Sequence, residues 1–319
     1  MSQVYLVTGA NSGLGLDTVR QLALMPTTRK VYLGCRSKVK VETAMEYLKT
    51  KHDIDATKLA YAHFDASEPQ EAIARAMKES IKDPLTGLVL NAGGIGHDTS
   101  QKPSGPNHVL DVYQINLIGH IQLVEALKTS NNLLAQGCKI VYAGSEGARG
   151  VPMMMIANPK LGTTAEWYKN QLEGGASKKK LDPMAIYALA KGMAALYFAE
   201  WARRNPDYSV WVVSPGGTSG TEALSAKAVP GHFKKMMPVM MPLMTAMGVM
   251  HPVEVGAARY VHALTAPNYD FASGTFVASK RGTTGTLSDQ TTSKRGKQYA
   301  DMNKQKAAFD ALSTYAQVA

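Results

Sequence analysis

Val4-Tyr5-Leu6-Val7, followed by Thr8-Gly9-Ala10-Asn11-Ser12-Gly13-Leu14-Gly15, is the stretch that decides the fold of this 319-residue chain. The apolar residues predict a short buried strand, and the glycines after it open a helix that we expect over residues 13–24. Glycine lets the backbone approach a pyrophosphate closely, and the N–H groups at a helix N-terminus favour negative charge. The stretch therefore predicts a dinucleotide cradle, with contacts from Gly9, Asn11, Ser12, Gly13, Leu14 and Gly15.

Strand-like apolar runs alternate with helical patterns beyond this cradle. Further strands are expected at residues 30–35, 59–64, 87–90, 139–143, 209–213 and 274–278. Further helices are expected at about residues 40–51, 69–82, 108–128, 184–203 and 295–317. Such alternation indicates βαβ units, and hence an α/β, doubly wound parallel sheet with helices on both faces and about seven strands. We expect one domain over residues 1–319, in which 282–319 form a linker and a C-terminal helix.

Candidate binding residues follow the strands directly, at the carboxyl ends where such sheets bind ligands. They are Asp65 and Ala66, then Asn91, Ala92 and Gly93, then Ser145, and finally Pro215, Gly216 and Thr218. The second strand ends in Arg36-Ser37-Lys38. Arg and Lys can clamp a 2′-phosphate, whereas an acidic residue at this place would bind the ribose hydroxyls of NAD. The sequence therefore favours NADPH/NADP+ as cofactor; the alternative is that Arg36 is only a solvated surface charge.

Tyr187 and Lys191 lie at positions i and i+4 and share one face of the helix expected at 184–203. A tyrosine with a pKa near 10 is a poor acid at neutral pH, but a nearby ammonium and an oxidised nicotinamide ring would lower that pKa. Tyr187 could then donate a proton to a substrate oxygen as hydride arrives. Ser145 could hydrogen-bond the same oxygen, and Asn116 could hold a water that links Lys191 to solvent. These four residues are the candidate catalytic set.

The motifs occur in an order that resembles the short-chain dehydrogenase/reductase superfamily over about residues 3–280. The set comprises the Gly-rich turn, Asp65, Asn91-Ala92-Gly93, Asn116, Ser145, Tyr187 with Lys191, and Pro215-Gly216. The resemblance implies a Rossmann-type fold and the catalytic roles given above. It also implies that Asn91, Ala92, Gly93, Pro215, Gly216 and Thr218 line the nicotinamide half of the site, where Tyr187 and Lys191 would also contact the cofactor.

Residues 146–186 separate Ser145 from Tyr187 as an active-site insertion. This spacing resembles the subgroup that contains retinol dehydrogenase-like enzymes and the light-dependent protochlorophyllide reductases. The stretches 34–36, 116–120 and 157–162 are also similar to sequences of that subgroup. The reductases usually carry a cysteine just after the Pro-Gly, where this chain has Gly217. Pigment photoreduction is therefore an alternative rather than the main expectation.

Methionines are concentrated at Met153–Met155 and again between Met236 and Met250. Methionine is flexible and polarizable, which suits irregular apolar ligands. We therefore expect a wide apolar substrate pocket under a lid at 222–250. Core packing of the same side chains is an equally open reading, and peripheral docking onto a membrane or a partner is a third, because Lys234 and Lys235 precede the run.

The formal charge is +10, but the basic residues are spread out and accompany no nucleic-acid motif, so we expect no nucleic-acid partner. Cys35 and Cys138 form neither a disulfide framework nor a metal-ligand pattern, and we expect no metal site. No apolar run reaches the roughly 18 residues of a spanning helix, and no signal peptide is visible. These features predict a soluble protein of a reducing intracellular compartment: the cytoplasm, or the plastid stroma if a transit peptide was removed.

The sequence as a whole predicts an NADPH-dependent oxidoreductase that acts on a bulky apolar substrate. Hydride would move to a carbonyl or an activated double bond, with Tyr187 as the proton donor. Two alternatives stay open: a light-dependent protochlorophyllide reductase, and a catalytically idle scaffold subunit. The sequence leaves open both a monomer and a homo-oligomer.

Overall fold

The computed structural model describes residues 2–95, 103–130, 133–152, 156–175, 182–219 and 244–318. Met153–Met155 and all of the expected lid before Met244 lie outside the described residues. Among the helices within these ranges, none has the length and apolar character needed to cross a membrane.

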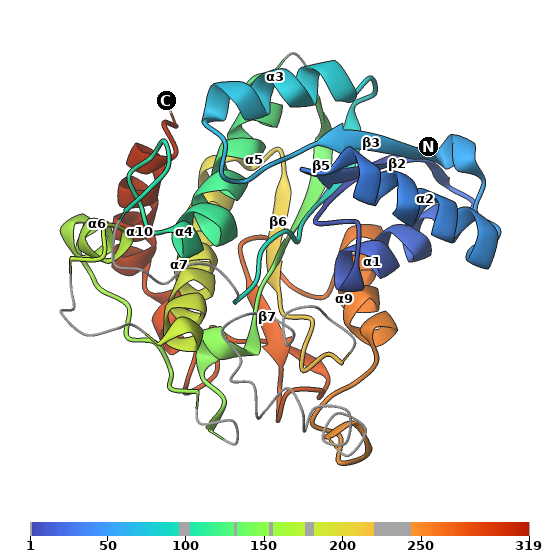
Figure 1. Ribbon diagram of the computed structural model, residues 1–319. Helices are drawn as coiled ribbons and strands as arrows, with labels where there is room; N and C mark the ends of the chain where they lie inside the picture. The colour runs from blue at the N-terminus through green and yellow to red at the C-terminus, as the bar shows by residue number, and fades with distance from the viewer. Residues whose placement is uncertain are drawn as a thin grey trace.

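One twisted sheet forms the centre of the molecule (Figure 1). Its spatial order is β3-β2-β1-β4-β5-β6-β7-β8, and the first seven strands are parallel. The strands are β1 (Gln3–Thr8), β2 (Thr28–Cys35), β3 (Leu59–His63), β4 (Leu85–Leu90), β5 (Leu134–Ala143), β6 (Ser209–Val213), β7 (Phe276–Ser279) and β8 (Leu287–Asp289). This is the Rossmann-type α/β fold that the sequence predicts.

The last strand departs from the prediction. β8 pairs antiparallel with β7 and lies inside the stretch 282–293, which we expected to be part of a linker. Its register joins Ala278 to Ser288, and the backbone N–H of Lys280 donates to the carbonyl of Thr286 at 2.8 Å. The Gly/Thr/Ser-rich composition of this stretch therefore belongs to a tight connection between two paired strands.

Helices cover both faces of the sheet, as its buried strands require (Figure 1). One face carries α1 (Gly13–Leu24), α2 (Lys38–His52) and α9 (Val253–Thr265). The other carries α3 (Gln70–Ser80), α4 (Asp111–Tyr113), α5 (Gly119–Thr129) and α7 (Pro183–Arg204). Outside α7 lie α6 (Ala165–Leu172), from the insertion, and α10 (Met302–Tyr315), the expected C-terminal helix. We did not anticipate α9 from the sequence.

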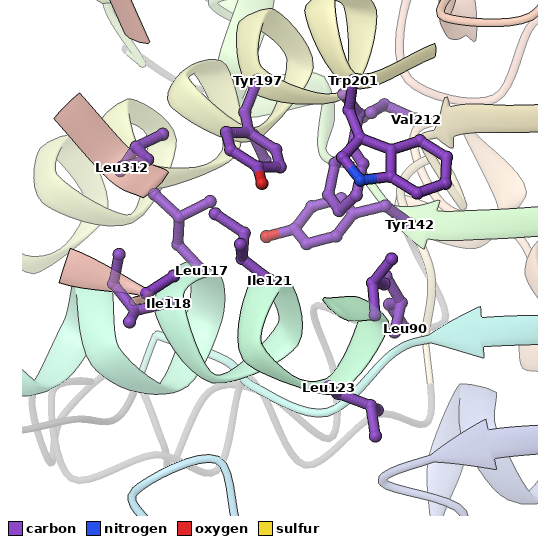
Figure 2. Close-up of a cluster of buried hydrophobic side chains, with 14 of the residues drawn as sticks. Leu90, Leu117, Ile118, Ile121, Leu123, Tyr142, Tyr197, Trp201, Val212 and Leu312 are labelled. Carbon is purple, nitrogen blue, oxygen red and sulfur yellow. The ribbon is translucent and has the colours of Figure 1, made fainter. Parts of the chain in front are cut away.

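The helix expected at 108–128 is present from Asp111 to Thr129, but it is not α-helical throughout. Between α4 and α5 the chain forms a π-helical turn, η2 (Gln114–Ile118), which contains Asn116. Such turns insert one extra residue into a helix and are frequent at functional sites. Figure 2 shows the buried cluster on this face, where Tyr142 of β5 lies between α7 and the helix that carries Leu117 and Ile121.

Candidate active site

A cavity of about 620 Å³ opens at the carboxyl ends of the central strands, where the strand order reverses between β1 and β4. Its wall unites most of the predicted site residues: Gly9, Asn11, Ser12, Gly13, Leu14, Arg36, Ser37, Asp65, Ala66, Asn91, Ala92, Gly93, Ser145, Tyr187, Lys191, Pro215, Gly216 and Thr218. Three predicted residues, Gly15, Lys38 and Asn116, lie outside this wall. Their surroundings show what each of them does instead.

The Gly-rich turn is built around two glycines that no other residue can replace. Gly9 has a φ of +62°, and a Cβ there would lie 2.9 Å from the Cα of Ala92. Gly15 is in the first turn of α1, and a Cβ there would lie 2.2 Å from the carbonyl oxygen of Gly9. Gly15 therefore does not face the cavity; it lets the N-terminus of α1 pack directly onto the turn, with its N–H groups directed at the site.

Side-chain hydrogen bonds join the end of β1 to the end of β4. The hydroxyl of Thr8 accepts from the backbone N–H groups of Asn91 at 2.8 Å and Ala92 at 2.9 Å. The amide of Asn91 donates back to the carbonyl oxygens of Thr8 at 3.0 Å and Gly9 at 3.4 Å. These bonds fix the cradle and the Asn91–Gly93 loop as one unit.

Basic side chains line the end of the cavity that β2 forms. Arg36 and Lys40 lie in the wall, beside Ser37, which caps the N-terminus of α2 by accepting from the N–H of Lys40. Lys38 points elsewhere and makes an exposed ion pair with Glu42 at 3.9 Å. Sequence reasoning missed Lys40; its position in the first turn of a helix capped by Ser37 is the signal that could have identified it.

Asp65 follows β3 and also lines this end of the cavity. Its carboxylate accepts from the N–H of Ser67 at 3.0 Å and from the Ser67 hydroxyl at 2.7 Å. The side chain is thereby held in one orientation at the edge of the cavity, next to Ala66.

Ser145, Tyr187 and Lys191 converge at the opposite end. Ser145 follows β5 and accepts from the N–H of Gly147 at 3.1 Å, so that its side chain caps η3 (Glu146–Arg149). Lys191 Nζ donates to the carbonyl oxygen of Ala143 at 2.8 Å and lies 5.5 Å from the centroid of the Tyr187 ring. The predicted catalytic triad is therefore assembled from β5 and α7, although 42 residues separate Ser145 from Tyr187.

Burial shifts the pKa values of both titratable groups at this end in the cofactor-free chain. Burial raises the pKa of Tyr187 to about 12, against a smaller opposing effect of its hydrogen bond with Ser145. Burial also lowers the pKa of Lys191 to about 7. The lysine charge is thus weakened rather than available to depress the tyrosine, because removal of both groups from water disfavours both charged forms.

Asn116 does not reach the cavity but supports the loop behind it. Its side-chain oxygen accepts from the N–H of Gly94 at 2.9 Å, and its amide donates to the carbonyl oxygens of Gly94 at 3.1 Å and Val112 at 2.9 Å. Its main-chain carbonyl accepts from the hydroxyl of Tyr142. The side chain therefore holds the end of the Asn91–Gly93 loop, and the Tyr142 hydroxyl lies between Lys191 and the Asn116 carbonyl.

Glu146, directly after Ser145, ties the serine loop to the Pro215–Gly216 loop. One carboxylate oxygen accepts from the Ser214 hydroxyl at 3.0 Å and from the N–H of Ser279 at 2.9 Å. The Ser214 hydroxyl in turn accepts from the N–H of Gly216 at 3.1 Å. One buried carboxylate thus sets the spacing between the ends of β5, β6 and β7.

Two buried arginines lie against this carboxylate. Arg149 Nε donates to Glu146 at 2.6 Å, and Arg259 of α9 lies 3.8 Å from its other oxygen. Arg259 also donates to the carbonyl oxygen of Gly285 at 2.9 Å, and Arg149 to that of Gly282. The network therefore attaches the β7–β8 connection to the site. Sequence reasoning missed all three charged residues, because none of them matches a motif and Arg259 is far from Glu146 and Arg149 in the chain.

Apolar side chains also line the cavity that contains Ser145 and Tyr187. They are those of Ile95, Val151, Ile156, Met184 and Met250. Val151, Ile156 and Met184 come from the insertion and its junction with α7, and Met250 ends the methionine-rich segment. Two aromatic residues of the insertion are not part of this wall. Tyr168 is fully buried, and Trp167 packs against it with ring centroids 4.9 Å apart.

Comparison with known proteins adds to this geometry. A sequence model of a family described as short chain dehydrogenase matches residues 3–157. A short-chain dehydrogenase/reductase of Armillaria gallica is 41% identical over 80 residues, and one of Phomopsis amygdali is 32% identical over 154 residues. Residues 3–157 of the chain are therefore similar to short-chain dehydrogenases.

These matches cover only part of each protein. They span 25% and 46% of this chain and 22% and 44% of the two relatives, so the chain spans less than half the length of either. The fold of the chain is also similar to that of salutaridine reductase from Papaver somniferum. That comparison has a TM-score of 0.60 at 21% identity and covers 86% of this chain and 99% of the other. It concerns the fold alone.

Proposed function

We propose that this chain is an NADPH-dependent oxidoreductase that reduces a carbonyl or an activated double bond of a bulky apolar substrate. One observation carries the proposal: a single cavity is lined by the Gly-rich cradle, by Arg36 and Lys40, and by the group Ser145, Tyr187 and Lys191. The similarity of residues 3–157 to short-chain dehydrogenases supports a nicotinamide cofactor. The choice of NADPH, the substrate class and the roles of individual residues are our proposals.

The dinucleotide fits the residues present. The pyrophosphate would lie on the N-terminus of α1, and the nicotinamide would lie between the Asn91–Gly93 loop and Pro215–Gly216. Arg36 and Lys40 would hold a 2′-phosphate, and neither makes an ion pair in the described part of the chain, whereas Lys38 does. The N-terminus of α2 adds a favourable dipole for the same anion.

At the opposite end of the cavity from Arg36 and Lys40, the hydrogen-bond donors would carry out the chemistry. When bound, the reduced cofactor supplies the hydride. Ser145 would hydrogen-bond the substrate oxygen and Tyr187 would donate the proton, which Lys191 would replace. A tyrosine whose pKa is raised is a reluctant acid, so proton donation is favoured only when negative charge develops on the substrate oxygen beside it.

The two alternatives have less support. The light-dependent reductases usually carry a cysteine where this chain has Gly217. A Cβ at Gly217 would lie 2.4 Å from the carbonyl oxygen of Val249. A cysteine side chain has no room at that position. An idle scaffold would have no need for Ser145, Tyr187 and Lys191 to face one cavity. We therefore do not propose either of them.

Cofactor selection is the direct test of the proposal. Arg36→Met and Lys40→Met should each weaken NADPH binding by about tenfold or more while NADH affinity stays nearly constant, because each removes a charge-assisted bond to the 2′-phosphate. Dissociation constants for both cofactors can be measured by nicotinamide fluorescence. Lys38→Met is the matched control and should leave both constants unchanged. Wild-type protein that binds neither cofactor at micromolar concentration would refute the proposed function.

A further inference from the structure

Tyr142 is a buried aromatic residue of β5 to which the proposed reaction gives no role. Its side chain is 0% exposed, and its hydroxyl donates to the main-chain carbonyl of Asn116 in the π-helical turn. Lys191 Nζ donates to the same hydroxyl at 3.3 Å. Figure 2 shows the ring between α7 and the helix that carries Leu117 and Ile121. The hydroxyl therefore lies between an amine that lines the cavity and a fixed backbone carbonyl.

The contacts of Lys191 account for two of its three available directions. A tetrahedral amine nitrogen has one bond to its own chain and three further positions. Ala143 O accepts along one of these positions, at 2.8 Å, and the Tyr142 hydroxyl accepts along a second. The amine also lies 4.6 Å from the centroid of the Tyr142 ring, within range of a cation–π attraction. The third position is left for the cavity that Lys191 lines together with Tyr187.

We propose that Tyr142 is a positioning residue for Lys191, whose hydroxyl orients the amine so that its remaining proton or lone pair faces Tyr187. The inference rests on the proposed function, because it assigns a role within that reaction. The carbonyl of Asn116 cannot pass a proton onward, so the lysine exchanges its proton through the cavity.

The surrounding groups determine the direction of the effect. Burial raises the pKa of Tyr142 well above its ordinary value, so the hydroxyl stays protonated and acts toward Lys191 only as an acceptor. The Tyr187 ring on α7 lies 5.5 Å from the amine, and Tyr260 on α9 lines the same cavity. His120 on α5 is neutral, because burial and the nearby lysine lower its pKa to about 3. Loss of the Tyr142 hydroxyl therefore removes support for the ammonium form of Lys191.

The proposal can be tested in the free protein by NMR. Carbon-13 at the lysine Cε position reports each ammonium, and Lys191→Met identifies the Lys191 signal. Tyr142→Phe should lower the pKa of Lys191 by about one unit or more, since it removes a hydrogen bond to a charged group. Tyr197→Phe removes the hydroxyl of another fully buried tyrosine of the same cluster and should leave the titration unchanged. An identical Lys191 titration in wild type and Tyr142→Phe would overturn the proposal.

Two further measurements separate this inference from protein instability and from the proposed function. A 3,5-difluorotyrosine at position 142 keeps the ring and the hydroxyl but weakens the acceptor, and should produce a smaller shift in the same direction. The rate of NADPH oxidation in a single turnover is expected to fall as the pH rises. In Tyr142→Phe this fall should occur at a lower pH than in the wild type, while the affinity for NADPH is retained. Failure of the wild type to bind NADPH would contradict the function, while the NMR titration would still decide the role of Tyr142.

Discussion

Tyr187 combines a reactive role with a protonation state that burial makes harder to change. Its proton must leave in the reaction, although burial raises its pKa to about 12. Tyr187→Phe should lower turnover by about 100- to 10,000-fold, the usual contribution of a positioned acid. NADPH affinity should change little, because the ring remains in the cavity wall. Steady-state kinetics with a panel of bulky ketones, together with fluorescence binding, measures both. If Tyr187→Phe turns over as fast as the wild type, Tyr187 is not the proton donor.

Lys191 should make stability depend on pH. Its pKa is about 7 in the folded chain against an ordinary value of 10.5, so between these values the unfolded chain binds more protons. The free energy of unfolding therefore rises with pH across this window, and this contribution is lost as pH falls toward 7. Urea denaturation of the cofactor-free protein at several pH values should show this rise. Lys191→Met should flatten it, and equal pH dependence in both proteins would contradict the assignment.

For individual residues, the sequence identified the candidate reactive groups but not the residues that hold them in place. Ser145, Tyr187 and Lys191 carry recognisable spacing, and all three face the cavity. Tyr142 and Glu146 carry no motif, since their importance depends on hydrogen bonds to partners that only the fold brings near. Asn116 is intermediate, because its position was predicted but the hydrogen bond from Gly94 to its side chain was not.

Glu146 is the point at which three strands of the sheet depend on one another. It connects the ends of β5, β6 and β7 and compensates the charges of Arg149 and Arg259. Glu146→Ala should reduce the free energy of unfolding by about 3–5 kcal/mol, because it leaves buried guanidinium groups without their counter-charge.

Chemical denaturation measures this loss. The control is Glu42→Ala, which breaks the exposed pair with Lys38 and should change the free energy of unfolding by less than about 1 kcal/mol. A similar small change in both variants would show that the buried network contributes little to stability.

The elements themselves were largely predictable where periodicity was strong. The helix expected at 13–24 is α1 with the same bounds, and the strand expected at 209–213 is β6. α9 was missed, although Pro252 directly precedes it and Ala257, Tyr260 and Leu264 give one buried face. β8 was not predictable in this way, because a three-residue strand is defined by its pairing with β7. The π-helical turn likewise has no local signature.

At the scale of the whole molecule, the C-terminal helix is part of the folded core. Ala308, Ala311 and Leu312 of α10 are fully buried, and the helix packs against α6 and α7. A chain that ends at Asp301 should therefore expose an apolar face of α7 and unfold at a clearly lower temperature than the full chain. Differential scanning calorimetry measures the change. The variant Lys306→Ala, which alters only an exposed pair with Asp310, should melt like the wild type.

The order of strands has a consequence for synthesis. From β4 to β8, each later strand pairs beside the one that precedes it in the chain. A chain that emerges from the ribosome can therefore extend its sheet at one edge without separating pairs already formed. At this edge the outermost strand is always the newest one, until β8, short and antiparallel, ends the series; β3 forms the opposite edge. The cavity is complete only then, because Thr283 in the β7–β8 connection is part of its wall.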